Sequence, residues 1–201
     1  MEKKKFKILA ASDIHGDSDA SKKLAEKAKK EKVDLVILAG DLTGAIETEN
    51  IIKPFIDRKQ RVVFVPGNWD SSESAEFFSK LYGVKDVGKH YVKYDDVGVF
   101  GIGSPDWQMD LNEKRTMKKL EEDFDKIKDL EKKIMVSHLH AADTKAEFSG
   151  IEGQEVLRKA IEKFQPDIFL SGHIHEAEGL KENIGNTRVF NLGKKGKIIE
   201  I

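Results

Sequence analysis

The chain has 201 residues, enough for one sizeable core, and its 35 Lys and Arg are balanced by 36 Asp and Glu, which argues against a dedicated nucleic-acid-binding protein. The absence of cysteine excludes disulfide bonds, cysteine-ligated zinc and a thiol nucleophile, and no apolar run approaches the roughly 20 residues of a membrane-spanning helix. Since residues 1–5 also lack the apolar core of a signal peptide, we expect a single cytoplasmic domain over residues 1–201 without a membrane partner.

The first 65 residues alternate strand-like and helix-like segments. Apolar runs at 6–11, 33–39 and 61–65 have the near-continuous hydrophobicity of buried parallel strands. Helices are predicted at 20–30, where apolar residues share one face, and at 46–56, where Pro54 interrupts the last turn. This β-α-β-α-β order predicts a mostly parallel sheet that is covered by helices on both faces.

The middle of the chain differs from the first part. Short strand-like pieces at 84–87, 90–94 and 97–102 predict an antiparallel meander, and a loop over 104–112 follows. A long helix comes next, with apolar residues on one face at Met117, Leu120, Phe124, Ile127 and Leu130. The remaining segments are a helix at 156–164 and strands at 133–137, 167–171, 188–192 and 197–201.

A residue that can bind a metal follows each buried strand of the parallel type. In open α/β sheets the carboxyl ends of the strands border the binding site, so these residues are expected to converge. Five of the six histidines of the chain lie in these segments. The seven candidate donors are Asp13, His15, Asp41, Asn68, His138, His173 and His175.

Carboxylate, amide and imidazole donors together suit Mn, Fe, Co, Ni or Zn better than Ca or Mg. Seven donors exceed what one ion with an open position uses. We therefore expect two divalent transition-metal ions, about 3.5–4 Å apart, with Asp41 as the bridging carboxylate. Each motif is weak alone, because Asp or Asn after a strand is more often a turn former or a helix cap. The prediction depends on five strand ends that coincide.

In this order and spacing the motifs resemble those of the calcineurin-like metallophosphoesterases, and in particular their small phosphodiesterase-like branch. The family pattern D-x-H, G-D, G-N-H-D/E, H and G-H-x-H corresponds here to Asp13-x-His15, Gly40-Asp41, Gly67-Asn68-Trp69-Asp70, His138 and Gly172-His173-x-His175. The resemblance covers nearly the whole chain. It implies the metallophosphoesterase fold, an α/β four-layer αββα sandwich of two mixed sheets flanked by helices.

The resemblance also implies how the site works. One metal would be held by Asp13, His15 and His175, the other by Asn68, His138 and His173, and Asp41 would bridge the two. A metal-bound hydroxide would attack phosphorus in line, so that the enzyme hydrolyses phosphate esters, with phosphodiesters favoured. The expected substrate is a small-molecule phosphate ester, and a nucleotide is one candidate.

One position departs from the family pattern. The His of G-N-H-D/E, a general acid or transition-state stabiliser in the family, is Trp69 here, and an indole N–H cannot transfer a proton. Asp70 therefore lacks its usual partner, and His140 is a candidate replacement or a supporting hydrogen-bond partner. The predicted catalytic residues are Asp41, Asn68, Asp70 and His140. Trp69 and Trp107 are candidates for binding an aromatic leaving group or a nucleobase, against the plainer roles of apolar lid and packing.

Two other functions stay open. A non-catalytic protein-interaction scaffold on the same fold is favoured by Trp69, but a scaffold has no need to retain all seven donors. A nuclease is disfavoured by the near-neutral charge, because no extended basic groove is expected. Self-association through a sheet edge or the central meander is also open.

Overall fold

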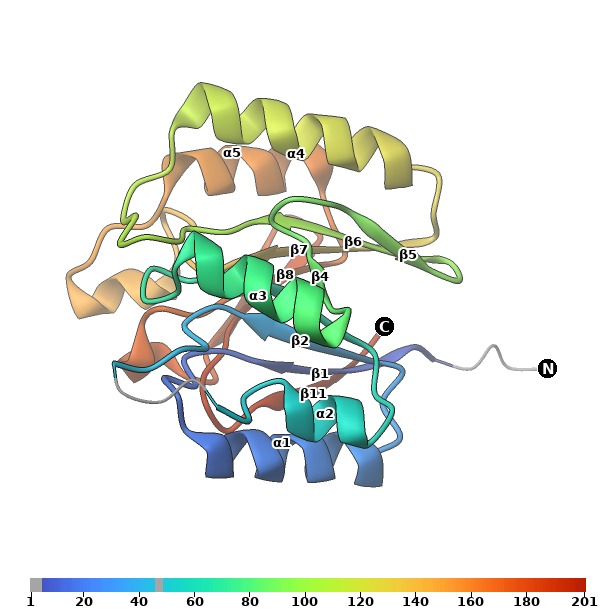
Figure 1. Cartoon of the computed structure of the whole chain (residues 1–201). Coiled ribbons are helices and arrows are strands. Elements are labelled where there is room, and N and C mark those ends of the chain that lie inside the picture. Colours follow the sequence, from blue (N-terminus) through green and yellow to red (C-terminus); the bar gives the residue numbers. More distant parts are fainter. Residues whose placement is uncertain (1–4, 46–48) are drawn as a thin grey trace.

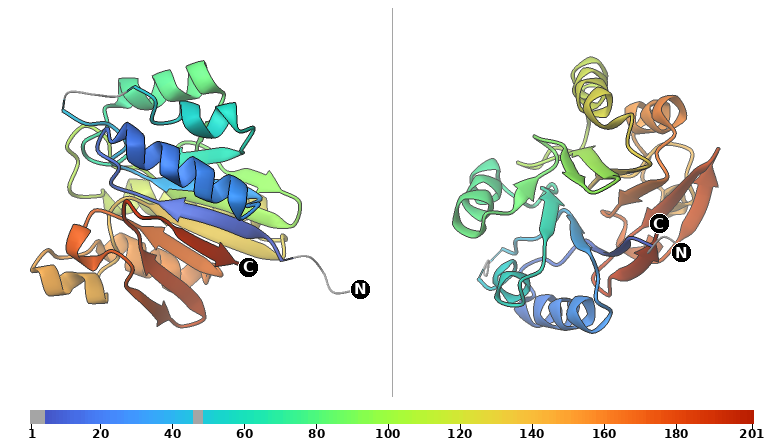
Figure 2. Two further views of the ribbon diagram at one scale, coloured as in Figure 1. Left: turned by 90° about the horizontal axis from the view of Figure 1, so that it is seen from below. Right: turned by 90° about the vertical axis from the view of Figure 1, so that its right-hand side faces the viewer.

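The computed structural model describes residues 5–45 and 49–201 (Figure 1). Two mixed β-sheets pack face to face, and helices cover both outer faces (Figure 2). The predicted four-layer αββα sandwich is therefore confirmed. Within the described residues, no helix is both long and apolar enough to cross a membrane.

The first sheet has the strand order β11-β1-β2-β3-β4. Its strands are β1 (Lys7–Ala11), β2 (Leu35–Ala39), β3 (Val62–Val65), β4 (Lys85–Asp86) and β11 (Lys197–Glu200). Strands β1 to β4 run parallel, and β11 returns antiparallel to β1, so that Ile8 pairs with both Leu35 and Ile199. The β2 run is buried over its whole length, as its uninterrupted apolar sequence predicts.

The second sheet has the strand order β5-β6-β7-β8-β10-β9. Its strands are β5 (Val92–Tyr94), β6 (Val97–Ile102), β7 (Lys132–Ser137), β8 (Ile168–Ser171), β9 (Lys181–Ile184) and β10 (Thr187–Asn191). The four inner strands are parallel, and β5 and β9 are antiparallel edge strands.

Helices cover the two outer faces. The first sheet carries α1 (Ser18–Lys30), α2 (Lys53–Asp57) and α3 (Ser72–Tyr82), and the second carries α4 (Glu113–Ile127) and α5 (Glu155–Phe164). Two short 3-10 helices, η1 (Lys145–Ser149) and η2 (His175–Ala177), lie in loops. The N-termini of α1, α3 and α4 are capped by Asp17, Ser71 and Asn112, whose side chains accept a backbone N–H of the first turn.

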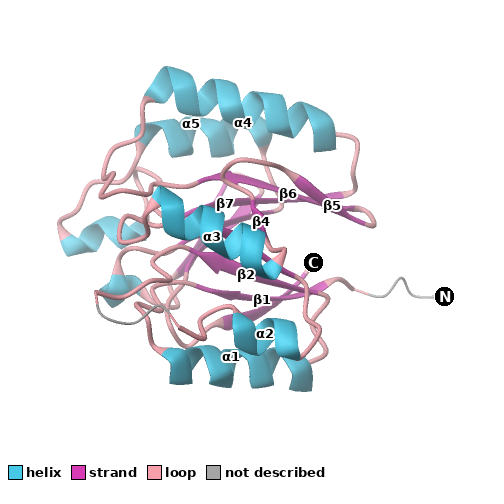
Figure 3. Ribbon diagram, in the orientation of Figure 1, coloured by secondary structure: helices cyan, strands magenta, loops and turns pink. Residues whose placement is uncertain are grey.

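Alternation along the strands separates the layers of the core. In β1, Ile8 and Ala10 face the second sheet, whereas Leu9 and Ala11 face the helices. Both faces of the strand pack against buried apolar residues, so the strand cannot shift in register without disrupting two packed layers. The strand ends are thereby held in a constant position. Figure 3 shows the loops that follow these strands gathered at one end of the sandwich, opposite the N-terminus.

Two sequence predictions need correction, and two elements were not predicted. The segment 84–87 does not join an antiparallel meander, because β4 pairs in parallel with β3 in the first sheet. The predicted helix at 46–56 has its first residues, 46–48, outside the described residues, and 49–52 form a turn and a bend. The helix there is only Lys53–Asp57, with Pro54 in its first turn, where a missing N–H has no cost. Helix α3 and strand β9 were not predicted.

Candidate metal centre

The centre lies where the loops of five parallel strands meet. Asp13 and His15 follow β1, Asp41 follows β2, and Asn68 follows β3 in the first sheet. In the second sheet His138 follows β7, and His173 and His175 follow β8. Since β1, β2 and β3 are neighbours and β7 and β8 are neighbours, all seven predicted donors come together between the two sheets.

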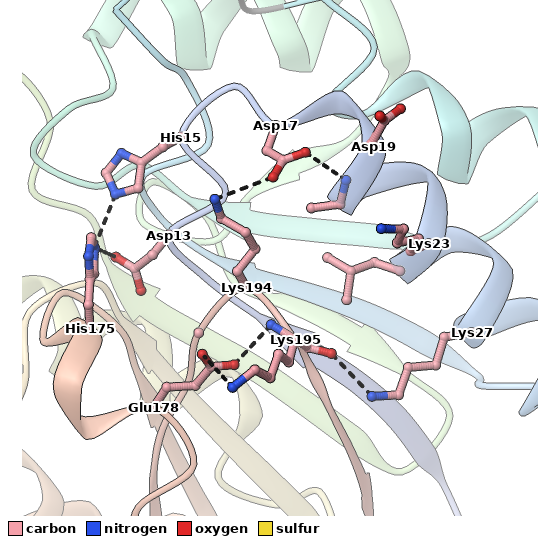
Figure 4. Close-up of a pocket in the computed structure, with 13 residues that line it drawn as sticks. Asp13, His15, Asp17, Asp19, Lys23, Lys27, His175, Glu178, Lys194 and Lys195 are labelled. Carbon is pink, nitrogen blue, oxygen red and sulfur yellow. Dashed lines mark hydrogen bonds and ion pairs between the residues drawn. The ribbon is translucent and has the colours of Figure 1, made fainter.

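The first group of donors is Asp13, His15 and His175. The Nε2 atoms of His15 and His175 face each other at 3.1 Å, and His175 Nε2 lies 3.5 Å from Asp13 Oδ1 (Figure 4). One ligand atom from each residue lies within 4.8 Å of the others. A shared cation would satisfy both ring nitrogens at once.

The second group is formed around His138, which is fully buried. Its Nδ1 lies 2.9 Å from the carbonyl oxygen of Ala39, so the Nδ1–H donates there and Nε2 can hold a proton or a metal ion. That Nε2 lies 2.9 Å from Asn68 Oδ1 and 3.3 Å from Asp41 Oδ2. Burial would lower the pKa of His138, but the hydrogen bond and charge of Asp41 outweigh burial and raise that pKa, which favours a proton on Nε2 at the place where a metal ion could bind.

His173 completes the set. Its Nε2 is buried and has no hydrogen-bond partner among the described residues. Burial and the charge of His138 lower the pKa of His173 to about 4, so the ring is neutral at pH 7 and can act as a ligand. Its backbone N–H donates to both carboxylate oxygens of Asp13 at 3.2 Å, which joins this loop to the first group.

Burial and neighbouring charges shift the pKa values of all three residues of the first group. Burial would raise the pKa of Asp13, but hydrogen bonding to His175 and the charge of His138 outweigh it and lower the pKa. Asp13 is therefore ionised. Burial lowers the pKa of His15, and Asp41 and Asp13 oppose that shift. Asp13 hydrogen bonding raises the pKa of His175. The donor set as a whole fits divalent ions that bind carboxylate, amide and imidazole groups.

The backbone at the centre is crowded and strained. A Cβ on Gly40 would lie 2.6 Å from His138 Nδ1, and a Cβ on Gly67 would lie 2.2 Å from Asp41 Oδ1. Four of the candidate donors adopt left-handed backbone conformations, with φ between 49° and 71°: Asp13, His15, Asp41 and His173. Such conformations disfavour side chains with a Cβ and persist where the surrounding structure enforces them, which is common at functional sites.

Asp70 is buried, and its carboxylate contacts the two loops that carry Asp41 and Asn68. Its carboxylate accepts the backbone N–H groups of Leu42, Thr43 and Gly67 and the hydroxyl of Thr43, at distances of 2.8 to 3.2 Å. Burial raises the pKa of Asp70, and these hydrogen bonds lower it in part. The carboxylate thus joins the loop after β2 to the loop after β3. Thr43 was not singled out by the sequence, since no motif marks it.

The two tryptophans lie side by side at the rim. Their ring centroids are 4.8 Å apart, and the Trp69 ring packs edge-on against His15 at 5.6 Å. Trp69 is 43% exposed and Trp107 is 64% exposed. The backbone N–H of Trp107 donates to the backbone carbonyl of Asn68 at 2.9 Å, which holds the loop over 104–112 against the centre.

His140 lies behind the centre. It is buried, its Nε2 is 3.3 Å from the carbonyl oxygen of Ile151, and its ring is stacked on that of His173 with centroids 6.4 Å apart. Burial lowers the pKa of His140. The ring is therefore neutral at pH 7, and it lies roughly parallel to the ring of His173.

Comparisons with known proteins place these observations in context. The model of the calcineurin-like phosphoesterase family matches residues 6–177. A search of curated proteins found no match. A solved structure from Thermus thermophilus is similar with a TM-score of 0.75 and 17% identity, over 98% of this chain and 99% of that chain.

Two further structures share the fold at low identity. An archaeal phosphodiesterase has a TM-score of 0.56 and 18% identity, over 97% of this chain and 99% of its own. A dimetal phosphatase from Danio rerio has a TM-score of 0.62 and 13% identity, over 94% of this chain and 88% of its own.

Proposed function

Because the chain belongs to the calcineurin-like phosphoesterase family, we propose that it is a di-metal-dependent phosphoesterase that hydrolyses phosphate esters, phosphodiesters above others. The proposed substrate is a small-molecule phosphate ester, and the proposed location is the cytoplasm. The observation that carries the proposal is the convergence of seven metal donors from two sheets on one space, with none of the family's ligands replaced.

We propose that Asp13, His15 and His175, which lie together, hold one ion and that Asn68, His138 and His173 hold the other. Asp13 also has a ligand atom within 4.8 Å of those of Asp41 and His138. Asp41 bridges the two ions. Its position supports this role, because Asp41 Oδ2 lies 3.7 Å from His15 Nε2 in one group and 3.3 Å from His138 Nε2 in the other. Two bound divalent ions would supply the activated water and neutralise charge on the phosphoryl oxygens. The similarity to a dimetal phosphatase supports two ions rather than one.

Hydrolysis forms a bond from the water oxygen to phosphorus and breaks the bond from phosphorus to the leaving oxygen, which then needs a proton. Trp69 cannot give one. The proposed substrates therefore have leaving groups that depart without protonation. The exposed rings of Trp69 and Trp107 beside His15 support binding of an aromatic or nucleobase group by stacking.

The contacts of Asp70 and His140 support positioning roles for both. The Asp70 carboxylate holds the loops of Asp41 and Asn68 through backbone amides. His140 stacks on His173 and is buried and neutral, which favours support of that ligand over proton donation. We propose that both act on catalysis through the metal ligands they hold.

The test is hydrolysis by metal-stripped protein of bis-p-nitrophenyl phosphate and p-nitrophenyl phosphate, with and without Mn²⁺. We expect Mn²⁺-dependent turnover that Asp41→Asn abolishes while the shape of the side chain is kept. The matched control is Asp129→Asn, an exposed carboxylate near the opposite end of the sandwich, which should retain the rate. A diester to monoester ratio below one would contradict the diester preference.

The alternative is a non-catalytic scaffold on the same fold. Trp69 favours it, because the family's acid is absent and an exposed tryptophan suits a protein contact. No turnover with Mn²⁺, Ni²⁺ or Zn²⁺ in protein that binds these ions would overturn the enzyme and support the scaffold.

A further inference from the structure

A cavity of about 810 Å³ opens directly beside the first donor group (Figure 4). Asp13, His15 and His175 line one end of it. From there it extends along α1 and is closed on the other side by the turn over 193–195 that follows β10. Its volume lies within the range of small-molecule sites and exceeds what one phosphoryl group would fill.

Lysines reach this cavity from both walls. Lys23 and Lys27 come from α1, and Lys194 and Lys195 come from the turn after β10 (Figure 4). The two walls are about 170 residues apart in the chain and meet only because β11 returns beside β1. The sequence does not identify this cluster, since the whole chain is rich in lysine.

Asp13 belongs to the candidate metal centre, and the other three carboxylates that line the cavity are already engaged. Asp17 lies 3.4 Å from Lys194 Nζ, and Glu178 lies 3.8 Å from Lys195 Nζ. Asp19 pairs at 3.0 Å with Lys22, which does not line the cavity. These carboxylates therefore leave part of the positive charge unbalanced.

Lys23 and Lys27 carry that unbalanced charge. The Lys27 ammonium donates to the backbone carbonyls of Lys195 and Gly196, at 3.2 and 2.7 Å, and so keeps its full charge without a carboxylate. Lys23 has neither a hydrogen bond nor an ion pair to any residue in 5–45 or 49–201. Lys23 lies six residues beyond the Asp17 cap, or about 9 Å along the helix axis.

We propose that this cavity binds a second anionic group of the substrate, so that the substrate class is a phosphate ester with a further phosphoryl group. The inference rests on the proposed function, since the reacting phosphoryl group is the one at the metal centre. Lysine ammonium groups are compact point charges that bind phosphate oxygens well. Ala20 and Leu24 provide an apolar strip between the two ends for the part that links the phosphoryl groups.

Two kinds of substrate carry two phosphoryl groups, and they differ in the linkage between them. In a nucleotide-like diphosphate the linkage is a phosphoanhydride, and in a bisphosphate ester it is a carbon chain. The probes are therefore inorganic pyrophosphate and propane-1,3-diol bisphosphate, with propyl phosphate as the one-phosphate reference. Titration calorimetry on Mn²⁺-loaded protein without excess metal measures their dissociation constants.

We expect at least one two-phosphate probe to bind wild-type protein about tenfold or more tightly than propyl phosphate. That advantage should fall about tenfold in Lys23→Ala/Lys27→Ala. It should fall about threefold in Lys23→Ala, which removes no hydrogen bond or ion pair among the described residues and so guards against misfolding. Propyl phosphate should bind the variants within twofold of wild type. The matched control is Lys29→Ala/Lys30→Ala, two exposed lysines on the same helix outside the cavity, which should keep the advantage.

An advantage that survives in both cavity variants, or that is absent in wild-type protein, would overturn the inference. So would an equal loss in the control. The probe that shows the larger lysine-dependent advantage identifies the linkage. Since binding needs no turnover, this result stands apart from the proposed function, whose failure would appear as absent hydrolysis by wild-type protein or as hydrolysis that Asp41→Asn retains.

Discussion

Replacing Gly67 with alanine tests whether Asp41 is a metal ligand without touching any donor. The added Cβ would lie 2.2 Å from Asp41 Oδ1 and 2.3 Å from Asp41 N. Carbon and oxygen atoms pack at about 3.5 Å, so the two loops must separate by about 1 Å. Metal sites tolerate displacements of only about 0.2 Å. The substitution should therefore misplace Asp41 several times beyond that tolerance.

The expected loss is about 10- to 100-fold in Mn²⁺ affinity, the range seen when the support of a ligand is disturbed. Wild-type protein in Mn²⁺ at 100 times its dissociation constant gains about 2.7 kcal/mol of stability from binding. A 100-fold weaker variant gains only about 0.4 kcal/mol at that concentration. Overpacking itself costs about 1–3 kcal/mol, which lowers the melting temperature without metal by roughly 2–12 °C.

Titration calorimetry and thermal unfolding with and without Mn²⁺ separate these two effects. The control is Gly98→Ala, where the Cβ would lie 2.8 Å from Ile127 Cβ at the amino end of β6, away from the centre. Gly98→Ala should lose comparable stability and keep its affinity for Mn²⁺. If Gly67→Ala binds Mn²⁺ as tightly as Gly98→Ala does, Asp41 is not a ligand and the reasoning fails.

Three further predictions concern single side chains. Trp69→His should raise turnover of esters with poor leaving groups by about tenfold or more, with little change for p-nitrophenyl esters, because it restores a proton donor; steady-state rates that stay flat would exclude that role. Asp70→Ala should lower the free energy of unfolding by about 2–5 kcal/mol in denaturant titrations, since buried donors lose their acceptor; a loss under about 1 kcal/mol would contradict the contacts. Asp86→Asn should raise the free energy of unfolding at pH 7 by about 1 kcal/mol. Burial raises the pKa of Asp86, and its Oδ2 has no hydrogen-bond partner among the described residues. The Asn side chain keeps the acceptor for the backbone N–H of Gly88. The raised folded-state pKa means that the ionised form destabilises the fold, so the advantage should vanish as pH falls below about 4, and an advantage that grows toward acid would refute it.

Much of the fold was predictable because its strands are simple. The β2 run is apolar throughout, and a strand buried on both faces needs no more information than that. Helix α3 was missed because Phe77 and Leu81 are exposed, which blurs the apolar stripe formed by Ala75 and Phe78. Its caps, Ser71 and the left-handed Gly83, were readable signals. Strand β9 is a charged edge strand, and only the Gly185 turn marks its hairpin.

The assignment of 84–87 to the wrong sheet has a different cause. A two-residue strand takes its partner from tertiary contacts, and β4 lies beside β3 because α3 returns it there. The centre was predictable in outline because parallel strands place their ends together. The contacts of Asp70 and His140 were not predictable, since each depends on which backbone group the side chain meets. The lysine cavity joins segments that no local pattern connects.

The division of the donors between two sheets has a mechanical consequence. Away from the centre, the sheets are held together by the apolar residues between them. Ions bound at the strand ends would add a cross-link between His15 and His175, which are 160 residues apart, and would join the halves of the sandwich along their seam. Metal loading should then slow amide exchange in the loops after β1, β2, β7 and β8, while the opposite end of both sheets continues to open at its own rate. The ions would therefore stabilise the contact between the two sheets in addition to any part they take in catalysis.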